Sequence, residues 1–222
     1  TTYDFDPYTG QMDKMNYQKG KEDQFFTKYE YDGLGRLKKS YTSSDDLLYK
    51  LEATARFYNH GALSRVELGH HAIQGVDFAY RLNGQLKGMN SATLNASRDI
   101  GQDGLLNNSA NSKNHDYFAR DVAGFTLGYF NNDYTSIGDQ STSNRFEADI
   151  SSLSDIKEVY NGMISSSVTA IYSEKTAGNG NSKELVKDPQ VGMYTYDMKY
   201  RLTEAAYMIS KDVCNADIPD EV

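Results

Sequence analysis

The sequence predicts an all-β fold of antiparallel hairpin repeats in a curved, twisted sheet, with one or two short helices. Three observations support this prediction: an aromatic motif recurs along the chain, tyrosine and glycine are abundant, and proline is scarce. The 18 tyrosines and 9 phenylalanines favour the half-buried surface of a sheet. They also bury a large area per residue, so a core is possible although only 38% of the residues are hydrophobic.

The composition also narrows the range of partners. A formal net charge of −8 repels phosphate backbones, so nucleic acid is not expected as a partner. The chain has no run of 18 apolar residues, so membrane insertion is not expected either. Its single cysteine forms neither an internal disulfide nor a cysteine-based metal site.

The recurring motif is clearest in YEYDGLGRLKKSY (29–41) and YTYDMKYRLTEAAY (194–207), which share Tyr-x-Tyr-Asp followed by Arg-Leu. FAYRLNGQLKGMN (78–90) keeps an aromatic pair and Gly-x-Leu, and weaker copies begin near residues 3 and 56. Turn glycines recur after 25, 26 and 23 residues, at Gly10, Gly35, Gly61 and Gly84. Periods of this size are typical of stacked β repeats.

Each copy is predicted to form a strand, a tight turn and a returning strand. Alternate aromatic residues lie on one face of a strand, Asp bonds its own backbone, and Gly adopts positive φ without steric cost. A single hairpin is marginal in water, so the copies are expected to stack. The residues assigned to this structural motif are Tyr29, Tyr31, Asp32, Gly35, Arg36, Leu37, Phe78, Tyr80, Gly84, Leu86, Tyr194, Tyr196, Asp197, Arg201 and Leu202.

Two copies depart from the pattern. Tyr200 replaces the turn glycine of the last copy, and Arg81 replaces the turn Asp of the copy at 78–90. Different turns are therefore expected at these two places.

The motif resembles the YD repeat of RHS proteins, whose core is Tyr-Asp-x-x-Gly-Arg-Leu. Residues 31–37 match that core fully, and similarity to bacterial RHS sequences extends from about residue 3 to residue 207. The resemblance implies a segment of a hollow β-shell, as in related toxin-complex and teneurin proteins. Such a shell encloses or presents another part of the same polypeptide, often a C-terminal toxin or effector.

A non-enzymatic role is expected, without cofactors, catalytic residues or metal ligands. The implied partners are the remainder of a larger polypeptide or its cargo, within a secretion or cell-surface complex, and the implied location is extracellular or at the cell surface. A cell-surface binding module for a glycan or protein is the alternative. Rows of exposed aromatic residues would favour that alternative.

The predicted organisation follows the repeats. Regular hairpins are expected over 1–90, a polar surface loop or insertion over 91–116, and further repeats over 117–210. A short amphipathic helix is expected near 147–158, and 211–222 is expected to be a tail.

Three groups of residues carry alternative chemistry. DIGQDG (99–104) is similar to a calcium loop, but Gly101 and Ala110 lack the oxygen ligands that such a loop needs, so a turn-rich loop is predicted. His70 and His71 are adjacent, and a solvated turn is predicted there.

The third group consists of the turn carboxylates Asp6, Asp32 and Asp197. They raise the possibility of glycoside hydrolysis, which needs a pair of carboxylates. Because they recur with the turns, a structural role is predicted. Arg36 and Arg201 are expected to pair with nearby acids or to stack on an aromatic ring of the next repeat.

Overall fold

A computed structural model describes most of the chain, as two compact units formed by residues 1–75 and 76–222. All statements below concern the described residues, which are 1–71, 73–94, 98–104, 117–135, 147, 156–176, 183–187 and 189–209.

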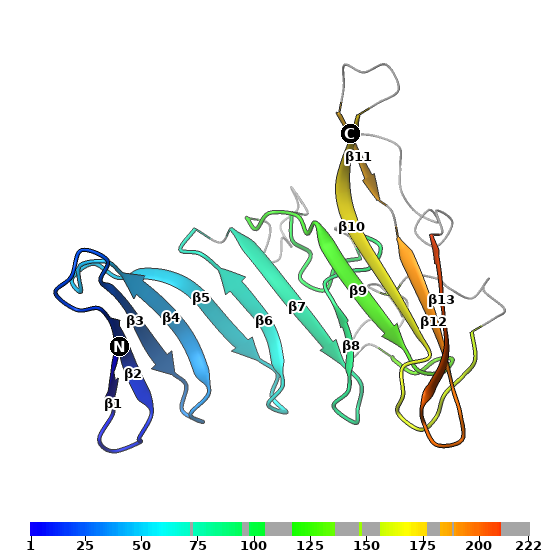
Figure 1. The fold of residues 1–222 in the computed structure, drawn as a ribbon, viewed down its shortest axis with the longest axis horizontal. Coiled ribbons are helices and arrows are strands. Elements are labelled where there is room, and N and C mark those ends of the chain that lie inside the picture. The colour runs from blue at the N-terminus through cyan, green and yellow to red at the C-terminus, as the bar shows by residue number, and fades with distance from the viewer. Residues whose placement is uncertain are drawn as a thin grey trace, which may run out of the picture. The chain divides into compact units, whose positions relative to one another are not determined.

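The first unit is a meander of antiparallel strands that pair in chain order (Figure 1). Its strands are β1 (Thr2–Phe5), β2 (Met12–Tyr17), β3 (Phe25–Tyr31), β4 (Leu37–Ser43), β5 (Lys50–Phe57) and β6 (Leu63–Leu68). Phe26 of β3 is the fully buried hydrophobic side chain of this unit, at 1% exposure.

The second unit continues the antiparallel pattern. Its strands are β7 (Gln74–Tyr80), β8 (Leu86–Met89), β9 (Ala123–Gly128), β10 (Ser166–Thr176), β11 (Lys183–Lys187), β12 (Gln190–Tyr196) and β13 (Leu202–Ile209). β10 pairs with β9 and β12 at its start and with β11 at its end. β12 also pairs with β13.

The predicted all-β, antiparallel class is confirmed, since every regular element of the described residues is a strand. The described part of the chain therefore has no helix that could span a bilayer. Of the segment predicted to be helical, 148–155 lies outside the described residues, as does the predicted tail at 211–222.

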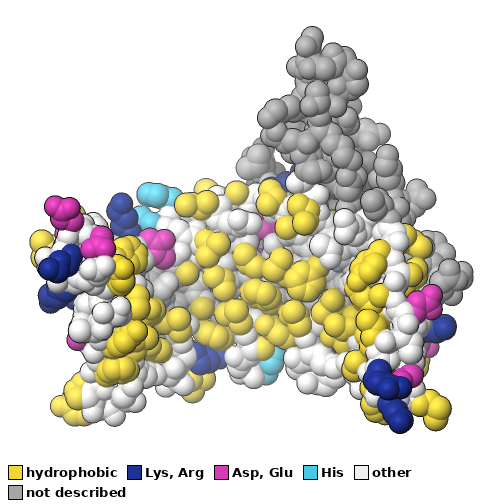
Figure 2. All heavy atoms as spheres, in the orientation of Figure 1, with side chains coloured by type: hydrophobic (Ala, Val, Ile, Leu, Met, Phe, Trp, Pro, Cys, Tyr) yellow, Lys and Arg dark blue, Asp and Glu magenta, His cyan; other side chains and the backbone are white. Residues whose placement is uncertain are grey.

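The two faces of the second unit's sheet differ because side chains alternate along each strand. On β7, Asp77 and Ala79 are buried, whereas Val76 and Phe78 on the opposite face are only partly buried. Ala79 belongs to the same face as the small core formed by Ala92, Val168 and Val191. Figure 2 shows hydrophobic side chains gathered over the strands in the middle of the chain.

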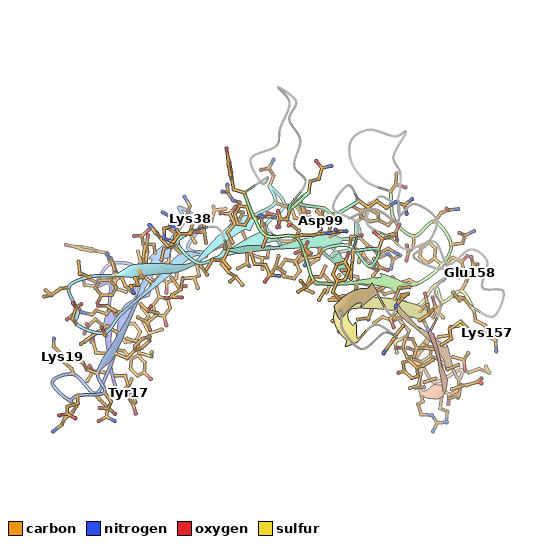
Figure 3. The ribbon with its side chains drawn as sticks, turned by 90° about the horizontal axis from the view of Figure 1, so that it is seen from above. Tyr17, Lys19, Lys38, Asp99, Lys157 and Glu158 are labelled. Atoms are coloured by element: carbon orange, nitrogen blue, oxygen red, sulfur yellow. The ribbon has the colours of Figure 1, made fainter. Side chains whose placement is uncertain are left out.

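Residues 91–94, which follow β8, cover the buried face. Asp99, labelled in Figure 3, belongs to the same connection between β8 and β9. Residues 91–94 are almost fully buried. A Cβ added at Gly124 of β9 would lie 2.2 Å from the carbonyl oxygen of Ser91, so glycine permits this close approach.

The sequence therefore led to a wrong expectation for part of 91–116. A surface loop or insertion is predicted there, yet 91–94 and residues 99, 101 and 103 are buried, while 95–97 and 105–116 lie outside the described residues. Polar composition is misleading here because the polar side chains bond within the loop: the hydroxyl oxygens of Ser91 and Thr93 are 2.7 Å apart.

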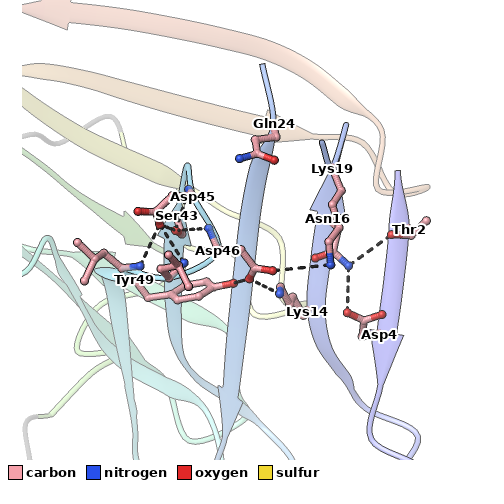
Figure 4. Close-up of polar contacts among 12 residues, drawn as sticks. Thr2, Asp4, Lys14, Asn16, Lys19, Gln24, Ser43, Asp45, Asp46 and Tyr49 are labelled. Atoms are coloured by element: carbon pink, nitrogen blue, oxygen red, sulfur yellow. Dashed lines mark hydrogen bonds and ion pairs between the residues drawn. The ribbon is translucent and has the colours of Figure 1, made fainter. Parts of the chain in front are cut away.

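Polar side chains join the strands of the first unit (Figure 4). The Lys14 ammonium bonds Asp46 and lies 5.1 Å from the centre of the Phe26 ring. The Tyr49 hydroxyl donates to Asp46 over 2.6 Å. The amide of Asn16 donates to Asp4 over 3.0 Å, which connects β2 to β1. These contacts stabilise a sheet that has little apolar core.

Candidate functional site at the repeated hairpin turns

The turn between β3 and β4 shows what the recurring motif does. Asp32 N–H donates to the Arg36 carbonyl, and Gly35 N–H donates to the Asp32 carbonyl, each over 2.9 Å. Gly35 has φ +78°, the left-handed conformation that glycine adopts without strain. This is a three-residue hairpin loop in which a type I turn is followed by a glycine bulge.

The side chain of Asp32 stabilises this turn by bonding to its backbone and to Arg36. One Asp32 carboxylate oxygen accepts from the backbone N–H groups of Leu34 and Arg36, at 2.9 and 3.0 Å. The other oxygen accepts from the Arg36 guanidinium, at 2.7 Å from Nε and 2.6 Å from Nη2. The expected pairing of Arg36 with a nearby acid is thus confirmed.

The turn between β12 and β13 repeats these contacts one by one. Asp197 accepts from the N–H groups of Lys199 and Arg201, at 2.8 and 2.9 Å, and from the Arg201 guanidinium at 2.7 Å. Tyr200 occupies the left-handed position with φ +62°. The prediction of a different turn here is wrong, because the side-chain and backbone bonds hold a tyrosine in the conformation that glycine prefers.

The other turns keep the backbone and vary the side chains. Gly84 N–H donates to the Arg81 carbonyl and Gly61 N–H to the Tyr58 carbonyl, each over 2.9 Å. At Arg81 a different turn was also expected, wrongly: Asn83 supplies the carboxamide oxygen that bonds the turn backbone. In the first turn Gly10 N–H donates to the Asp6 carbonyl, which makes that turn one residue longer.

The strand register shifts just before each of these turns, and the shift places an aromatic residue opposite an apolar one across the hairpin. The aromatic residue is the last of the outgoing strand, and its partner is the first residue of the returning strand. The pairs are Phe5 with Met12, Tyr31 with Leu37, Phe57 with Leu63, Tyr80 with Leu86, and Tyr196 with Leu202.

Consecutive turns are linked by the residue that follows the left-handed glycine. The Gln11 carboxamide donates to the Gly35 carbonyl over 3.0 Å, and the Arg36 guanidinium donates to the Gly61 carbonyl over 3.4 Å. In the second unit the Gln85 carboxamide donates to the Gly162 carbonyl over 2.8 Å. In all three links the donor belongs to the earlier turn and the acceptor to the later one.

Tyrosine hydroxyls make a second set of links between neighbouring strands. Tyr31 donates to the Met12 carbonyl, and Tyr196 donates to the Ile164 carbonyl, each over 2.9 Å. Burial raises the pKa of both hydroxyls, so they remain protonated donors at neutral pH. The Arg36 guanidinium also lies 4.1 Å from the centre of the Phe57 ring, as the predicted stacking on the next repeat requires.

The motif side chains differ in exposure. Six aromatic residues are partly buried: Tyr29, Tyr31, Phe78, Tyr80, Tyr194 and Tyr196. Leu37 and Leu202 remain 43% and 55% exposed. The ring of Tyr194 packs edge-on against Tyr207, and its hydroxyl lies 3.0 Å from that of Ser167.

The turn carboxylates have lowered pKa values. The Arg36 side chain and backbone N–H lower the pKa of Asp32, the backbone N–H and side chain of Arg201 lower that of Asp197, and the backbone N–H groups of Thr9 and Tyr8 lower that of Asp6. The general acid of a glycoside hydrolase needs the opposite shift. Each of the three carboxylates thus bonds to groups of its own turn.

The histidines have aromatic neighbours. The rings of His70 and His71 meet edge-on with centres 5.0 Å apart, and both residues are exposed. His60 stacks on Tyr58 with ring centres 5.2 Å apart. His115 lies outside the described residues. Among the described side chains, the one group with metal-ligand spacing contains no histidine.

Comparisons with known proteins give a distant structural similarity. No family profile matches the sequence, and no curated protein matches it. A chain of the Photorhabdus luminescens Tc holotoxin pore, with a mutated TccC3, aligns at 12% identity and a TM-score of 0.41. A chain of the TcdB2-TccC3-Cdc42 complex aligns at 10% identity and a TM-score of 0.37.

Both alignments cover 91% of this chain and 9% of the other chain. The chain therefore spans about 9% of the length of the structures that it matches. Similarity at this level does not identify a family. The resemblance to RHS proteins therefore depends on the motif residues alone.

Proposed function

We propose that the chain is a non-enzymatic structural segment of a YD-repeat β-shell that encloses or presents another part of a longer polypeptide. The enclosed part would be a C-terminal toxin or effector, and the shell would act outside the cell or at the cell surface, within a larger complex. The resemblance of the motif to RHS repeats concerns architecture, and the role of the segment is what we propose here.

The observation that supports this role most directly is the bonding from turn to turn. Gln11, Arg36 and Gln85 each donate to the carbonyl of the left-handed glycine of a later turn. Side chains that could bind a ligand are instead used to set the spacing between hairpins. A wall needs such bonding, because a sheet one layer thick has little core to hold neighbouring hairpins together.

A second observation concerns the sheet face opposite the covering loops. Phe78, Met89 and Phe125 are cross-strand neighbours on that face and are only partly buried. Partly buried apolar side chains in a row provide a surface against which an enclosed segment can pack.

The alternative, a binding module for a glycan or protein, draws on the exposed aromatic side chains. Tyr8 and Tyr117 are 96% and 87% exposed. A binding module predicts saturable binding to an isolated glycan or protein by the 222-residue chain. A shell segment predicts no such binding.

The decisive experiment uses the native polypeptide isolated without truncation. Its intact mass is measured, and a C-terminal piece is sought that stays bound after cleavage. A far larger chain that retains such a piece supports the shell. A free chain of 24.9 kDa with nothing bound would contradict it.

Two variants of the native polypeptide sharpen this experiment. Gly35→Val forces a branched side chain into the left-handed conformation and displaces the Gln11 carboxamide, which lies 2.9 Å from the added Cβ. Gly33→Ala lies in the same turn with open space around it and is the control. Protease should reach the retained piece faster in Gly35→Val only; equal protection in both variants would argue against a wall at this position.

A further inference from the structure

The second unit buries four carboxylates close together. One carboxylate oxygen from each of Asp77, Asp99 and Asp103 lies within 4.8 Å of the other two. The side chain of Asp121 interacts with all three. The exposed fractions of the four residues are 5%, 5%, 0% and 4%. Carboxylates this close together repel one another when they are ionised.

Three separate segments bring the acids together, and each is fixed locally. Asp77 is in β7, where the Asn90 carboxamide oxygen accepts from its backbone N–H over 2.8 Å. Asp99 and Asp103 lie in the covering loop, and Asp103 N–H donates to an Asp99 oxygen over 3.2 Å. Asp121 precedes β9, next to Arg120, whose backbone lies 3.0 Å from a Cβ added at Gly104.

The second observation is a set of buried oxygens without partners. Both carboxylate oxygens of Asp121 and one of Asp99 are buried and have no hydrogen-bond partner. Buried polar atoms are satisfied in the great majority of cases, so an unpaired carboxylate aimed at other carboxylates points to a missing ligand.

We propose that Asp77, Asp99, Asp103 and Asp121 bind a hard divalent cation, Ca²⁺ in the first instance. Ca²⁺ takes oxygen ligands at about 2.3–2.6 Å, so two of its ligands are separated by at most about twice that distance, as the oxygens of Asp77, Asp99 and Asp103 are. Asp121, which interacts electrostatically with these three, supplies the fourth carboxylate. Zinc is disfavoured because its protein sites use mainly sulfur and nitrogen ligands.

This site explains why the sequence pattern led to no metal prediction. A calcium loop of the kind that DIGQDG resembles supplies all its ligands from one continuous stretch of sequence. Here the loop contributes only Asp99 and Asp103, while Asp77 and Asp121 come from 22 residues before and 18 residues after that pair. Gly101 and Ala110 need not be ligands in such a site.

Cation binding would connect β7 to the loop that covers it and to the segment that leads into β9. The site is independent of the proposed shell function, because it is formed by carboxylates of the second unit alone. Its role would be to hold the covering loop on the sheet only where the free cation concentration is sufficient.

The test is calorimetric titration of CaCl₂ into the metal-free 222-residue chain at pH 8. We expect one site and a Tm that rises with CaCl₂ concentration. Asp103→Asn and Asp121→Asn should each weaken binding at least tenfold. Both keep the shape of the side chain and replace one carboxylate oxygen by an amide nitrogen, so folding should persist. Asp13→Asn, on an exposed residue of β2, is the control and should bind as the parent does.

Two results would overturn the proposal. One is a folded parent chain with neither a binding heat nor a Tm change up to millimolar CaCl₂, which would mean that protons alone neutralise the cluster. The other is unchanged Ca²⁺ binding in both Asp103→Asn and Asp121→Asn, which would place the cation elsewhere. MgCl₂ in parallel titrations distinguishes the two hard cations.

Discussion

The two units use the same hairpin but bury different amounts of side chain. In the first unit, Phe26 is the one buried hydrophobic side chain among the described residues. In the described part of the second unit, eight such side chains are buried: Ala79, Ala92, Leu94, Phe118, Tyr129, Val168, Ala170 and Val191. Both units have the turn with the left-handed residue, so the turn is not the source of the difference.

The difference comes from the long connection between β8 and β9. Where connections are short, the sheet has two open faces and depends on turn bonds, tyrosine hydroxyls and ion pairs. Where a long connection folds back, it covers one face, creates a small core and buries four acids. The turn residues thus determine the repeated hairpin. The connection between β8 and β9 determines where the sheet gains a core and a candidate cation site.

The largest effect should come from Gly124→Val, which tests the covered unit. A Cβ here would meet the Ser91 carbonyl oxygen at 2.2 Å, so the loop has to leave the sheet. We expect a loss of about 3 kcal/mol or more in the free energy of unfolding, measured by urea titration with tyrosine fluorescence. Gly33→Ala, with open space around it, should change stability by less than about 0.5 kcal/mol. Similar values for both variants would mean that loop packing contributes little.

The next effect is a pH dependence that belongs to the covered unit. Burial, followed by the charge of Asp99, raises the pKa of Asp121 to about 9 in the folded chain, whereas an unfolded Asp ionises near about 3.9. Between these values the folded state holds a proton that the unfolded state has released, so stability falls as pH rises, by at most about 1.4 kcal/mol per pH unit. Urea titrations at pH 6 and pH 8 with EGTA should show this fall. Asp121→Asn should flatten it, and an unchanged slope in that variant would assign the effect to other groups.

A reciprocal pair of turn variants tests the feature that the units share. Gly35→Ala places a side chain at φ +78° and should destabilise by about 1–2 kcal/mol. Tyr200→Gly relieves the same conformation at φ +62° and should stabilise by about 1 kcal/mol, because Tyr200 is 61% exposed and loses little packing. Thermal unfolding of both variants measures the opposite shifts. Shifts of the same sign would contradict the equivalence of the two turns.

The smallest effect concerns the first unit. Tyr31→Phe removes the donor to the Met12 carbonyl and should destabilise by about 0.5–1.5 kcal/mol. Tyr3→Phe, on a tyrosine of β1 that is 52% exposed, is the control and should be neutral. Hydrogen exchange at the amides of β2 and β3 reports the change locally. Equal protection in both variants would show that the hydroxyl link is not needed.

The hairpins were predictable from sequence because their determinants are local. Asp32 and Gly35 bond within their own turn, and alternating aromatic residues define the strands. The turn at Tyr200 was missed because side-chain bonds from Asp197 outweigh the residue's own conformational preference. The acid cluster was missed because its members are far apart in sequence. Polarity suggested exposure for residues 91–104, whereas tertiary packing buries most of the described residues there.

The one-way bonding between turns has a consequence for biosynthesis. Each donor, at Gln11, Arg36 and Gln85, belongs to a turn that leaves the ribosome before its acceptor does. A finished hairpin therefore presents an unsatisfied donor to the emerging chain, and the first hairpin that arrives with a free glycine carbonyl meets it. This direction matches that of translation, so the sheet can add hairpins one at a time during synthesis, without waiting for its far end.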